Sequence, residues 1–302
     1  MTTENPLLEG LEDERHSPPA VRVVFGASGD LTTRKLMPAI ERLHRRGLVP
    51  SGFSVVGVAR TELSDDDFRA RMHETVKDAG PGWEALTSGF RYVAGDYGDP
   101  GTFSRLRDVL DDVDRERGTG GNRAFYLATV PDVFARVVGG LAAEGLNRPH
   151  RDGAFARVVV EKPFGRDLRS AQALDAALHE AFAEEQVYRI DHYLGKETVQ
   201  NVLALRFANA IFEPIWNRRY VDSVQITVAE SDGVGHRGGF YESAGALRDI
   251  VQNHVMQVLA LTAMEPPASI DAQGIRDEKV KALRAVDVLT REEVAHDAVR
   301  GQ

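Results

Sequence analysis

The sequence predicts an α/β fold in which a doubly wound parallel sheet is followed by the first part of an α+β domain with a largely antiparallel sheet. Up to residue 190, short apolar runs of strand length alternate with longer amphipathic segments. This alternation is typical of a parallel sheet with helices on both faces, whose buried strands read as continuous apolar runs. Beyond residue 220, a run with apolar residues at every second position indicates a half-exposed antiparallel strand.

Length and composition are ordinary for a globular protein of two domains. The chain has 302 residues, of which 42% are hydrophobic and 27% are charged. It contains no cysteine, which excludes disulfides and thiolate metal ligands and fits a reducing compartment. We therefore expect a cytoplasmic protein, and we expect no metal site.

Charge and hydropathy argue against two classes of partner. The formal net charge of -9 disfavours nucleic acid, whose binding depends on many phosphate contacts. No apolar run approaches the roughly 20 residues needed to cross a bilayer, which argues against a membrane partner. An anionic small molecule would have to be held by a local cluster of cations.

The domain boundaries follow from the same patterns. Residues 1–20 are polar and acidic, and they lack the basic start and apolar run of a signal peptide, so we expect a disordered lead-in. Residues 21–188 contain the strand–helix alternation and should form the sheet domain. Residues 189–302 should form the second, α+β domain.

Six apolar runs are the expected strands of the parallel sheet. They lie at residues 21–25, 53–59, 90–93, 123–129, 157–161 and 187–190. Helical patterns fall between them, with clear examples at residues 102–117 and 133–144. Pro38 interrupts the first helical pattern, so that helix should be kinked or should start late.

A glycine turn follows the first expected strand. Its residues are Gly26, Ala27, Ser28, Gly29, Asp30, Leu31 and Thr32. A strand, a glycine turn and a helix form the arrangement in which backbone N–H groups and the helix dipole receive the pyrophosphate of a dinucleotide. The G-x-x-G spacing alone would serve equally well in a tight turn that binds nothing.

The end of the second expected strand bears on which dinucleotide would bind. An NAD site has an acid here that accepts hydrogen bonds from the ribose hydroxyls, but this strand ends in Ala59, Arg60 and Thr61, with no acid before Glu62. An arginine suits the 2′-phosphate of NADP, although an exposed arginine at a strand end is also common without any ligand.

Several polar side chains lie close together directly after the last expected parallel strand. Asp191, His192, Tyr193 and Lys196 place a carboxylate, an imidazole, a phenol and an ammonium group within six residues. Donors so close together can hold a compact dianion such as a sugar phosphate. A surface turn of assorted polar residues is the alternative.

The second domain should contain a helix at residues 201–212, a strand at 221–228 and a helix at 244–264. His254 lies on the apolar stripe of the last helix. Such a histidine is either a satisfied core residue or a desolvated base that works near neutral pH. Asp249, five residues earlier, would lie about 140° away around an α-helix.

Four motifs, in their order and spacing, resemble glucose-6-phosphate dehydrogenase. They are the glycine turn at residues 26–31, Glu161-Lys162-Pro163-Phe164-Gly165, RIDHYLGK at residues 189–196 and RDIVQNH at residues 248–254. The last two are specific, whereas the first two also occur in other dinucleotide-binding families. The resemblance extends from about Val21 to the last residue.

The resemblance implies a Rossmann-like NADP-binding domain and oxidation of glucose 6-phosphate at C1 to the 6-phospho-lactone, the first step of the oxidative pentose phosphate pathway. It implies that His254 is the general base and that Asp191 orients its imidazolium. The implied substrate-binding residues are Lys162, His192, Tyr193, Lys196, Glu230 and Asp249. The implied coenzyme-binding residues are Gly26, Ser28, Gly29, Asp30, Leu31, Thr32, Arg60, Tyr126 and Lys162.

Two features depart from the family pattern. Thr33 stands where many relatives carry a lysine or arginine that would contact a coenzyme phosphate. The chain also ends at Gln302, whereas relatives continue with a segment that supplies most of the antiparallel sheet, the subunit interface and a further substrate-binding lysine. A homo-oligomer is therefore expected for a full-length relative rather than for this chain. An NADP-binding or regulatory remnant without turnover is the alternative to an active dehydrogenase.

Overall fold

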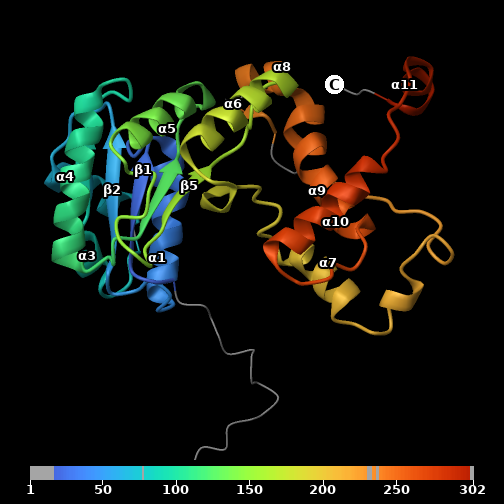
Figure 1. Ribbon diagram of the computed structural model, residues 1–302, viewed down its shortest axis with the longest axis horizontal. Coiled ribbons are helices and arrows are strands. Elements are labelled where there is room, and N and C mark those ends of the chain that lie inside the picture. The colour runs from blue at the N-terminus through green and yellow to red at the C-terminus, as the bar shows by residue number, and fades with distance from the viewer. Residues whose placement is uncertain (1–16, 77, 230–232, 236–237, 300–302) are drawn as a thin grey trace, which may run out of the picture. The chain divides into compact units, whose positions relative to one another are not determined.

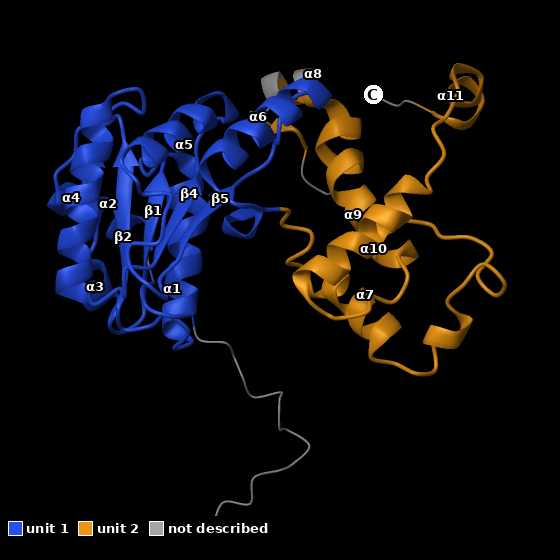
Figure 2. Ribbon diagram, in the orientation of Figure 1, with its two compact units in different colours: residues 1–190 blue, residues 191–302 orange. Residues whose placement is uncertain are grey.

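The computed structural model describes residues 17–76, 78–229, 233–235 and 238–299 (Figure 1). The chain divides into two compact units, Met1–Ile190 and Asp191–Gln302 (Figure 2). The break falls just past the boundary expected at residue 188. The disordered lead-in expected at residues 1–20 lies outside the described residues as far as residue 16, and the first strand begins at Ala20.

The first unit is built on a parallel sheet of six strands. The strands are β1 (Ala20–Phe25), β2 (Phe53–Ala59), β3 (Arg91–Ala94), β4 (Arg123–Leu127), β5 (Ala156–Val160) and β6 (Val187–Arg189). Their order in the sheet is β3-β2-β1-β4-β5-β6, and every neighbouring pair is parallel. This is the doubly wound order, which confirms the expected fold class. The strand order reverses between β1 and β4, and ligands of open α/β sheets bind outside the strand ends at such a switch point.

Helices cover both faces of this sheet. They are a π-helical turn η1 (Thr32–Leu36), α1 (Met37–Arg45), α2 (Asp65–Thr75), α3 (Trp83–Thr87), α4 (Pro100–Arg117), α5 (Phe134–Ala143) and α6 (Leu168–Ala181). One apolar cluster joins the sheet to α4, α5 and α6, and another joins it to α1, α2 and α3. Successive residues of β1 alternate between them, since Val23 and Phe25 belong to the first cluster and Val24 to the second. Burial on both faces is why these strands are continuous apolar runs.

In its described residues, the second unit has helices as its only regular secondary structure. It contains α7 (Glu197–Phe207), α8 (Gly238–Ala246), a π-helix η6 (Leu247–Val255), α9 (Met256–Ala263), α10 (Ala272–Arg284) and α11 (Arg291–Asp297). A small apolar cluster of Val199, Leu261 and Met264 joins α7 to α9. Arg206 of α7 is buried beside it and donates to the carbonyls of Leu261 and Met264, each at 2.7 Å. This arginine ties α7 to the C-terminal end of α9.

The strand expected at residues 221–228 is wrong, and the described residues of the second unit contain no antiparallel sheet. Those residues form no strand, and Val224 is 51% exposed. The alternation is present in the sequence, but a strand exists only when a neighbour accepts and donates its ladder hydrogen bonds. The described part of the second unit contains no strand that could do so.

The long helix expected at residues 244–264 is three segments instead of one. A kink at Gly245, whose φ is +64°, precedes the π-helix η6, which then continues into α9. The helix expected at 201–212 is α7, which begins and ends earlier. No helix in the described part of the chain is long and apolar enough to span a bilayer, and the cytoplasmic location stays a prediction.

Two adjacent glycines of α5 provide a test of the packing between α4 and α5. A Cβ on Gly140 would lie 2.2 Å from the buried ring of Phe103, whereas one on Gly139 would have nothing within 4 Å. Gly140→Ala should therefore lower the free energy of unfolding by about 1–3 kcal/mol. Gly139→Ala should raise it by about 0.5–1 kcal/mol, because alanine restricts the unfolded chain more than glycine does.

The measurement is urea unfolding followed by the fluorescence of Trp83, which is buried in the first unit. The other of the chain's two tryptophans, Trp216, is replaced by phenylalanine in every variant so that only the first unit reports. Equal effects of the two substitutions would contradict the described approach of Gly140 to Phe103.

Candidate active site

The turn after β1 is shaped by Gly26. Its φ is +86°, and a Cβ at this position would lie 2.3 Å from the carbonyl oxygen of Ala128, just past β4. No other residue could take this place, so the turn passes closely beside the neighbouring strand end at the switch point. The Gly26 N–H donates to the hydroxyl of Tyr97 at 2.9 Å, and that hydroxyl in turn donates to the carbonyl of Val58.

Other contacts hold the rest of the turn. The hydroxyl of Thr32 donates to the carbonyl of Gly26 at 3.1 Å, and the helical segment begins at Thr32. The guanidinium of Arg71 donates to the carbonyl of Ser28 at 2.8 Å, and Thr61 donates to the Ser28 hydroxyl at 3.1 Å. Tyr97 and Arg71 were missed from the sequence, because each lies far along the chain from the turn and in no recognisable motif.

Two positions bear on how the coenzyme would bind. Arg60 was expected to contact the 2′-phosphate, and Thr33 put a second phosphate contact in question. Arg60 is exposed directly after β2. Burial raises the pKa of the Tyr97 hydroxyl, and the hydrogen bond with Gly26 and the charge of Arg60 oppose this shift. Arg60 therefore acts electrostatically on a group that binds the glycine turn. The hydroxyl of Thr33 donates to the carbonyl of Gly29 at 3.3 Å, so its side chain closes the turn.

The end of β5 carries Lys162, which follows Glu161 and precedes a cis peptide bond to Pro163. Tyr126 of β4 is buried, and its hydroxyl donates to the carboxylate of Glu161. Burial and this carboxylate both raise the pKa of Tyr126. Tyr126 thus braces the strand end that positions Lys162, and its expected contact with a coenzyme stays a prediction.

In the second unit, residues 191–196 form a tight turn that leads into α7. Backbone bonds run from Leu194 to Asp191, from Gly195 to His192 and from Lys196 to Tyr193, at 3.0, 3.3 and 3.1 Å. The Tyr193 N–H donates to Oδ1 of Asp191 at 2.9 Å, which fixes the carboxylate to its own turn. The motif that stood out in the sequence is therefore a compact backbone structure.

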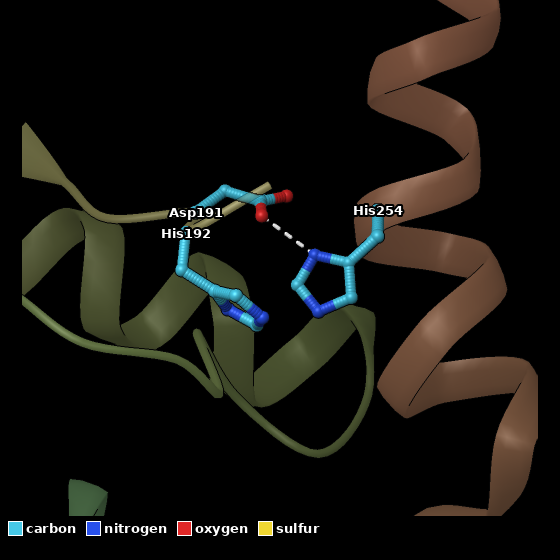
Figure 3. A group of neighbouring side chains, drawn as sticks. All are labelled: Asp191, His192 and His254. Atoms are coloured by element: carbon cyan, nitrogen blue, oxygen red, sulfur yellow. Dashed lines mark hydrogen bonds and ion pairs between the residues drawn. The ribbon is translucent and has the colours of Figure 1, made fainter. Parts of the chain in front are cut away.

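His254 meets this turn from the π-helix η6. Its side chain is 0% exposed, and its Nδ1 lies 2.6 Å from Oδ1 of Asp191. Figure 3 shows the carboxylate and the ring of His192 turned toward the ring of His254. The imidazole therefore has the carboxylate partner that was expected from the resemblance, across 63 positions of sequence.

Two aromatic rings pack on His254. The Tyr193 ring stacks on it, with centroids 4.0 Å apart and planes 12° apart, and the His192 ring meets it edge-on at 4.6 Å. The ammonium group of Lys196 lies 3.5 Å from the centroid of Tyr193. Because a stacked ring and an ammonium group cannot share one face at these distances, they lie on opposite faces of Tyr193. His192 and Lys196 are exposed, whereas Tyr193 is buried.

The π-helix changes the expected relation between Asp249 and His254. The sequence argument placed them about 140° apart by α-helical geometry. Both lie within Leu247–Val255, where hydrogen bonds join residues five positions apart. Residues five apart then lie near one another on successive turns, so Asp249 is closer to the His254 face than an α-helix allows. Glu230, the other residue expected to accept sugar hydroxyls, lies outside the described residues.

The same cluster also bears on the question of a metal. Asp191, His192 and His254 can each offer a ligand atom, and these atoms lie within 4.8 Å of one another. However, two ligands of one zinc ion, each about 2.0–2.1 Å from it in tetrahedral geometry, lie more than about 3 Å apart. The 2.6 Å between Nδ1 and Oδ1 is instead a hydrogen-bond distance, which favours a shared proton over a shared cation. The absence of a metal site stays a prediction.

The fold and the site together define the class of protein to which this chain belongs. The doubly wound sheet with a glycine turn at its switch point is the architecture of dinucleotide-binding proteins. The second unit adds a buried carboxylate–imidazole pair, which is suited to proton transfer.

Comparison with known proteins identifies the family. Residues 23–201 match the glucose-6-phosphate dehydrogenase NAD-binding domain, and residues 203–302 match the C-terminal domain of the same family. The chain is 50% identical over 289 residues to glucose-6-phosphate 1-dehydrogenase 2 of Mycobacterium tuberculosis (strain ATCC 25618 / H37Rv), covering 93% of this chain and 56% of that protein. It is 47% identical over 286 residues to glucose-6-phosphate 1-dehydrogenase of Bacillus subtilis (strain 168), covering 94% and 58%.

A solved structure agrees with these sequences. It is glucose-6-phosphate dehydrogenase in complex with its substrate glucose-6-phosphate, and it matches with a TM-score of 0.82 at 37% identity, over 92% of this chain and 58% of that one. The chain belongs to the glucose-6-phosphate dehydrogenase family, and its first unit is a nicotinamide-dinucleotide-binding domain. It spans 56–58% of the length of the relatives named above.

The buried pair can be tested against an exposed pair in the same unit. Asp191→Ala leaves the buried imidazole without its acceptor and should lower the free energy of unfolding by about 1–3 kcal/mol. The matched control is Asp297→Ala, which removes the partner of His296 in a pair of 2.8 Å whose side chains are 89% and 56% exposed. Exposed pairs contribute little, so this control should leave stability nearly unchanged.

Unfolding is followed by the fluorescence of Trp216, which lies in the second unit and donates to the carbonyl of Thr262 at 2.8 Å. Trp83 is replaced by phenylalanine throughout. If Asp191→Ala proved as harmless as Asp297→Ala, the hydrogen bond with His254 would not be part of the folded state.

Proposed function

We propose that this chain carries the coenzyme-binding domain and the catalytic pair of an NADP-dependent glucose-6-phosphate dehydrogenase. The proposed reaction oxidises the C1 hydroxyl of glucose 6-phosphate to 6-phospho-glucono-1,5-lactone. The buried hydrogen bond between His254 and Asp191 carries the proposal, because it gives an imidazole the orientation and electrostatic support that a general base needs. Family membership and the substrate named for a similar solved structure support the choice of sugar phosphate.

In the proposed mechanism His254 takes the proton of the C1 hydroxyl on Nε2. Its other nitrogen, Nδ1, is held by Asp191, so the imidazolium that forms faces a carboxylate. The C1 carbon loses a hydride at the same time, and the C–O bond becomes the carbonyl of the lactone. Bound NADP⁺ would supply the acceptor for that hydride.

The phosphate of the substrate would bind at the turn of residues 191–196. His192 and Lys196 are exposed and can donate to it, and charge-assisted bonds to phosphate are strong. The side chain of His254 is fully buried, with the rings of Tyr193 and His192 packed on it. Nε2 therefore has to be uncovered before a sugar can reach it. Both rings belong to the proposed phosphate site, so a movement of either ring on phosphate binding would also change the surroundings of the base.

The first unit has features that fit NADP. Gly26 allows the turn to approach the neighbouring strand end, and the helical segment begins directly after the turn. Gly29, Asp30 and Leu31 complete that turn. Arg60 follows β2 and would contact the 2′-phosphate, which supports NADP rather than NAD. We also propose that Lys162 and Asp249 contact the sugar.

A steady-state assay of the purified 302-residue chain tests the proposal. NADPH formation is followed by absorbance with glucose 6-phosphate and, as the control substrate, with glucose. We expect turnover of glucose 6-phosphate and little turnover of glucose. His254→Asn should lower kcat by about 10²–10⁴ with little change in KM, since the base acts in the transition state. NADP⁺ binding without turnover would overturn the proposal and support the coenzyme-binding remnant.

The coenzyme assignment has its own test. Arg60→Ala should weaken NADP⁺ binding by about 10–100-fold, the effect of losing a hydrogen bond to a charged group, and should leave NAD⁺ binding nearly unchanged. Binding of both coenzymes is measured by calorimetric titration, which needs no turnover. The control is Arg115→Ala, another exposed arginine of the first unit, paired with Asp112 on α4. Equal loss for both coenzymes would show that Arg60 does not recognise the 2′-phosphate.

A further inference from the structure

We propose that Arg71 is a second cation for the 2′-phosphate of NADP⁺, acting together with Arg60 at the edge of the glycine turn. The inference deepens the proposed function, because it rests on the proposed coenzyme, although not on the reaction at the sugar. Arg71 lies outside the four motifs that resemble the family, and its place beside the turn is visible only in the structure.

The first observation is the position of the Arg71 guanidinium. Arg71 belongs to α2 and is partly buried, and its Nη2 donates to the carbonyl of Ser28 in the glycine turn at 2.8 Å. Within the described part of the chain, this is the only hydrogen bond of the guanidinium. A guanidinium has five N–H donors, so most of its donors are available to a ligand that binds at the turn.

The second observation is that Ser28 also joins the turn to the end of β2. The hydroxyl of Thr61, the residue after Arg60, donates to Oγ of Ser28 at 3.1 Å. The carbonyl of Thr61 accepts the hydroxyl of Tyr92 at 2.8 Å. Burial raises the pKa of that hydroxyl and the charge of Arg71 opposes the shift, which agrees with these contacts. Arg71 and the neighbour of Arg60 therefore contact one serine from two different elements.

The charge of Arg71 is not neutralised by the acids at the start of its own helix. Asp65 and Asp66 pair with Arg69 at 3.7 and 3.3 Å, and Asp67 closes the cap of α2. Among the described residues, Arg71 forms no ion pair. A partly buried cation without a counter-charge is stabilised by an anion that binds next to it.

A phosphate at this place needs cations from outside the turn. Residues 26–33 contain no lysine or arginine, and their one charged residue is Asp30. A phosphate monoester carries about −1.5 to −2 charges at pH 7, which one arginine neutralises only in part. Arg60 from β2 and Arg71 from α2 would provide two charges and strong charge-assisted hydrogen bonds. NAD⁺ has a hydroxyl instead of this phosphate, so Arg71 would contribute to the selection of NADP⁺.

The experiment is a calorimetric titration of the 302-residue chain with NADP⁺ and with NAD⁺, which differ only in the 2′-phosphate. Arg71→Gln removes the charge but keeps an N–H donor for the carbonyl of Ser28. It should weaken NADP⁺ binding by about 10-fold or more and leave NAD⁺ binding nearly unchanged. Arg71→Lys keeps the charge and should retain most of the NADP⁺ affinity. Arg69→Gln, the matched control on the same helix, should change neither affinity.

Two results for Arg71→Gln would overturn the inference. Equal loss for both coenzymes would show that Arg71 only holds the turn or contacts the pyrophosphate that both coenzymes share. Unchanged NADP⁺ binding would show that Arg71 does not contact the coenzyme. A parent chain that does not prefer NADP⁺ would overturn the coenzyme assignment together with the inference, whereas a parent that prefers NADP⁺ and an unaffected variant would overturn the inference alone.

A measurement on the parent chain covers the case in which Arg71→Gln does not fold. The NMR signal of the Arg71 Nε–H group is assigned by its loss in the conservative variant Arg71→Lys. Adenosine 2′,5′-bisphosphate, which carries the distinguishing phosphate, should shift this signal, and adenosine 5′-monophosphate should shift it much less. An Arg71 signal that responds equally to the two nucleotides, or to neither, would contradict the inference.

Discussion

The chemistry of the second unit depends on one hydrogen bond, between a fully buried imidazole and the carboxylate of a tight turn. Neither group would be stable there alone, since a buried polar group without a partner is costly. The turn of residues 191–196 presents the carboxylate, and η6 presents the ring. Arg206 secures α7, which begins where this turn ends, to the end of α9, which continues from η6. The packing of the helices thereby maintains the distance between the two partners.

The first unit depends on a different constraint, the close approach of two backbone segments. Gly26 passes so near to Ala128 that no side chain fits, and this brings the turn to the point where the strand order reverses. Tyr97 and Arg71 then hold the turn through its backbone groups. The residues that shape this site are thus partly different from those that would contact a coenzyme.

Much of this organisation could be predicted from the sequence. The six parallel strands were visible as continuous apolar runs, because burial on both faces leaves that pattern. The pairing of Asp191 with His254 followed from a family resemblance, since 63 positions of sequence separate them and no local pattern joins them. Residues 221–228 show the limit of pattern reasoning, because alternation describes a strand's faces but not whether a partner strand exists.

The other features that could not be predicted from the sequence also have physical causes. Tyr97 and Arg71 act through the backbone of distant residues, which leaves no motif. The relation of Asp249 to His254 was misjudged because α-helical geometry was assumed for a segment that is a π-helix.

The direction in which the side chain of His254 points depends on the π-helical geometry of its segment. A π-helix holds more residues in each turn than the 3.6 of an α-helix. If Leu247–Val255 kept its nine residues but relaxed to α-helical geometry, residues five apart would lie about 140° from one another, and the side chains after the segment would rotate relative to those before it. The ring would then leave the carboxylate although every residue type at the site was kept. The site therefore depends on the helix type of this segment as well as on its residues.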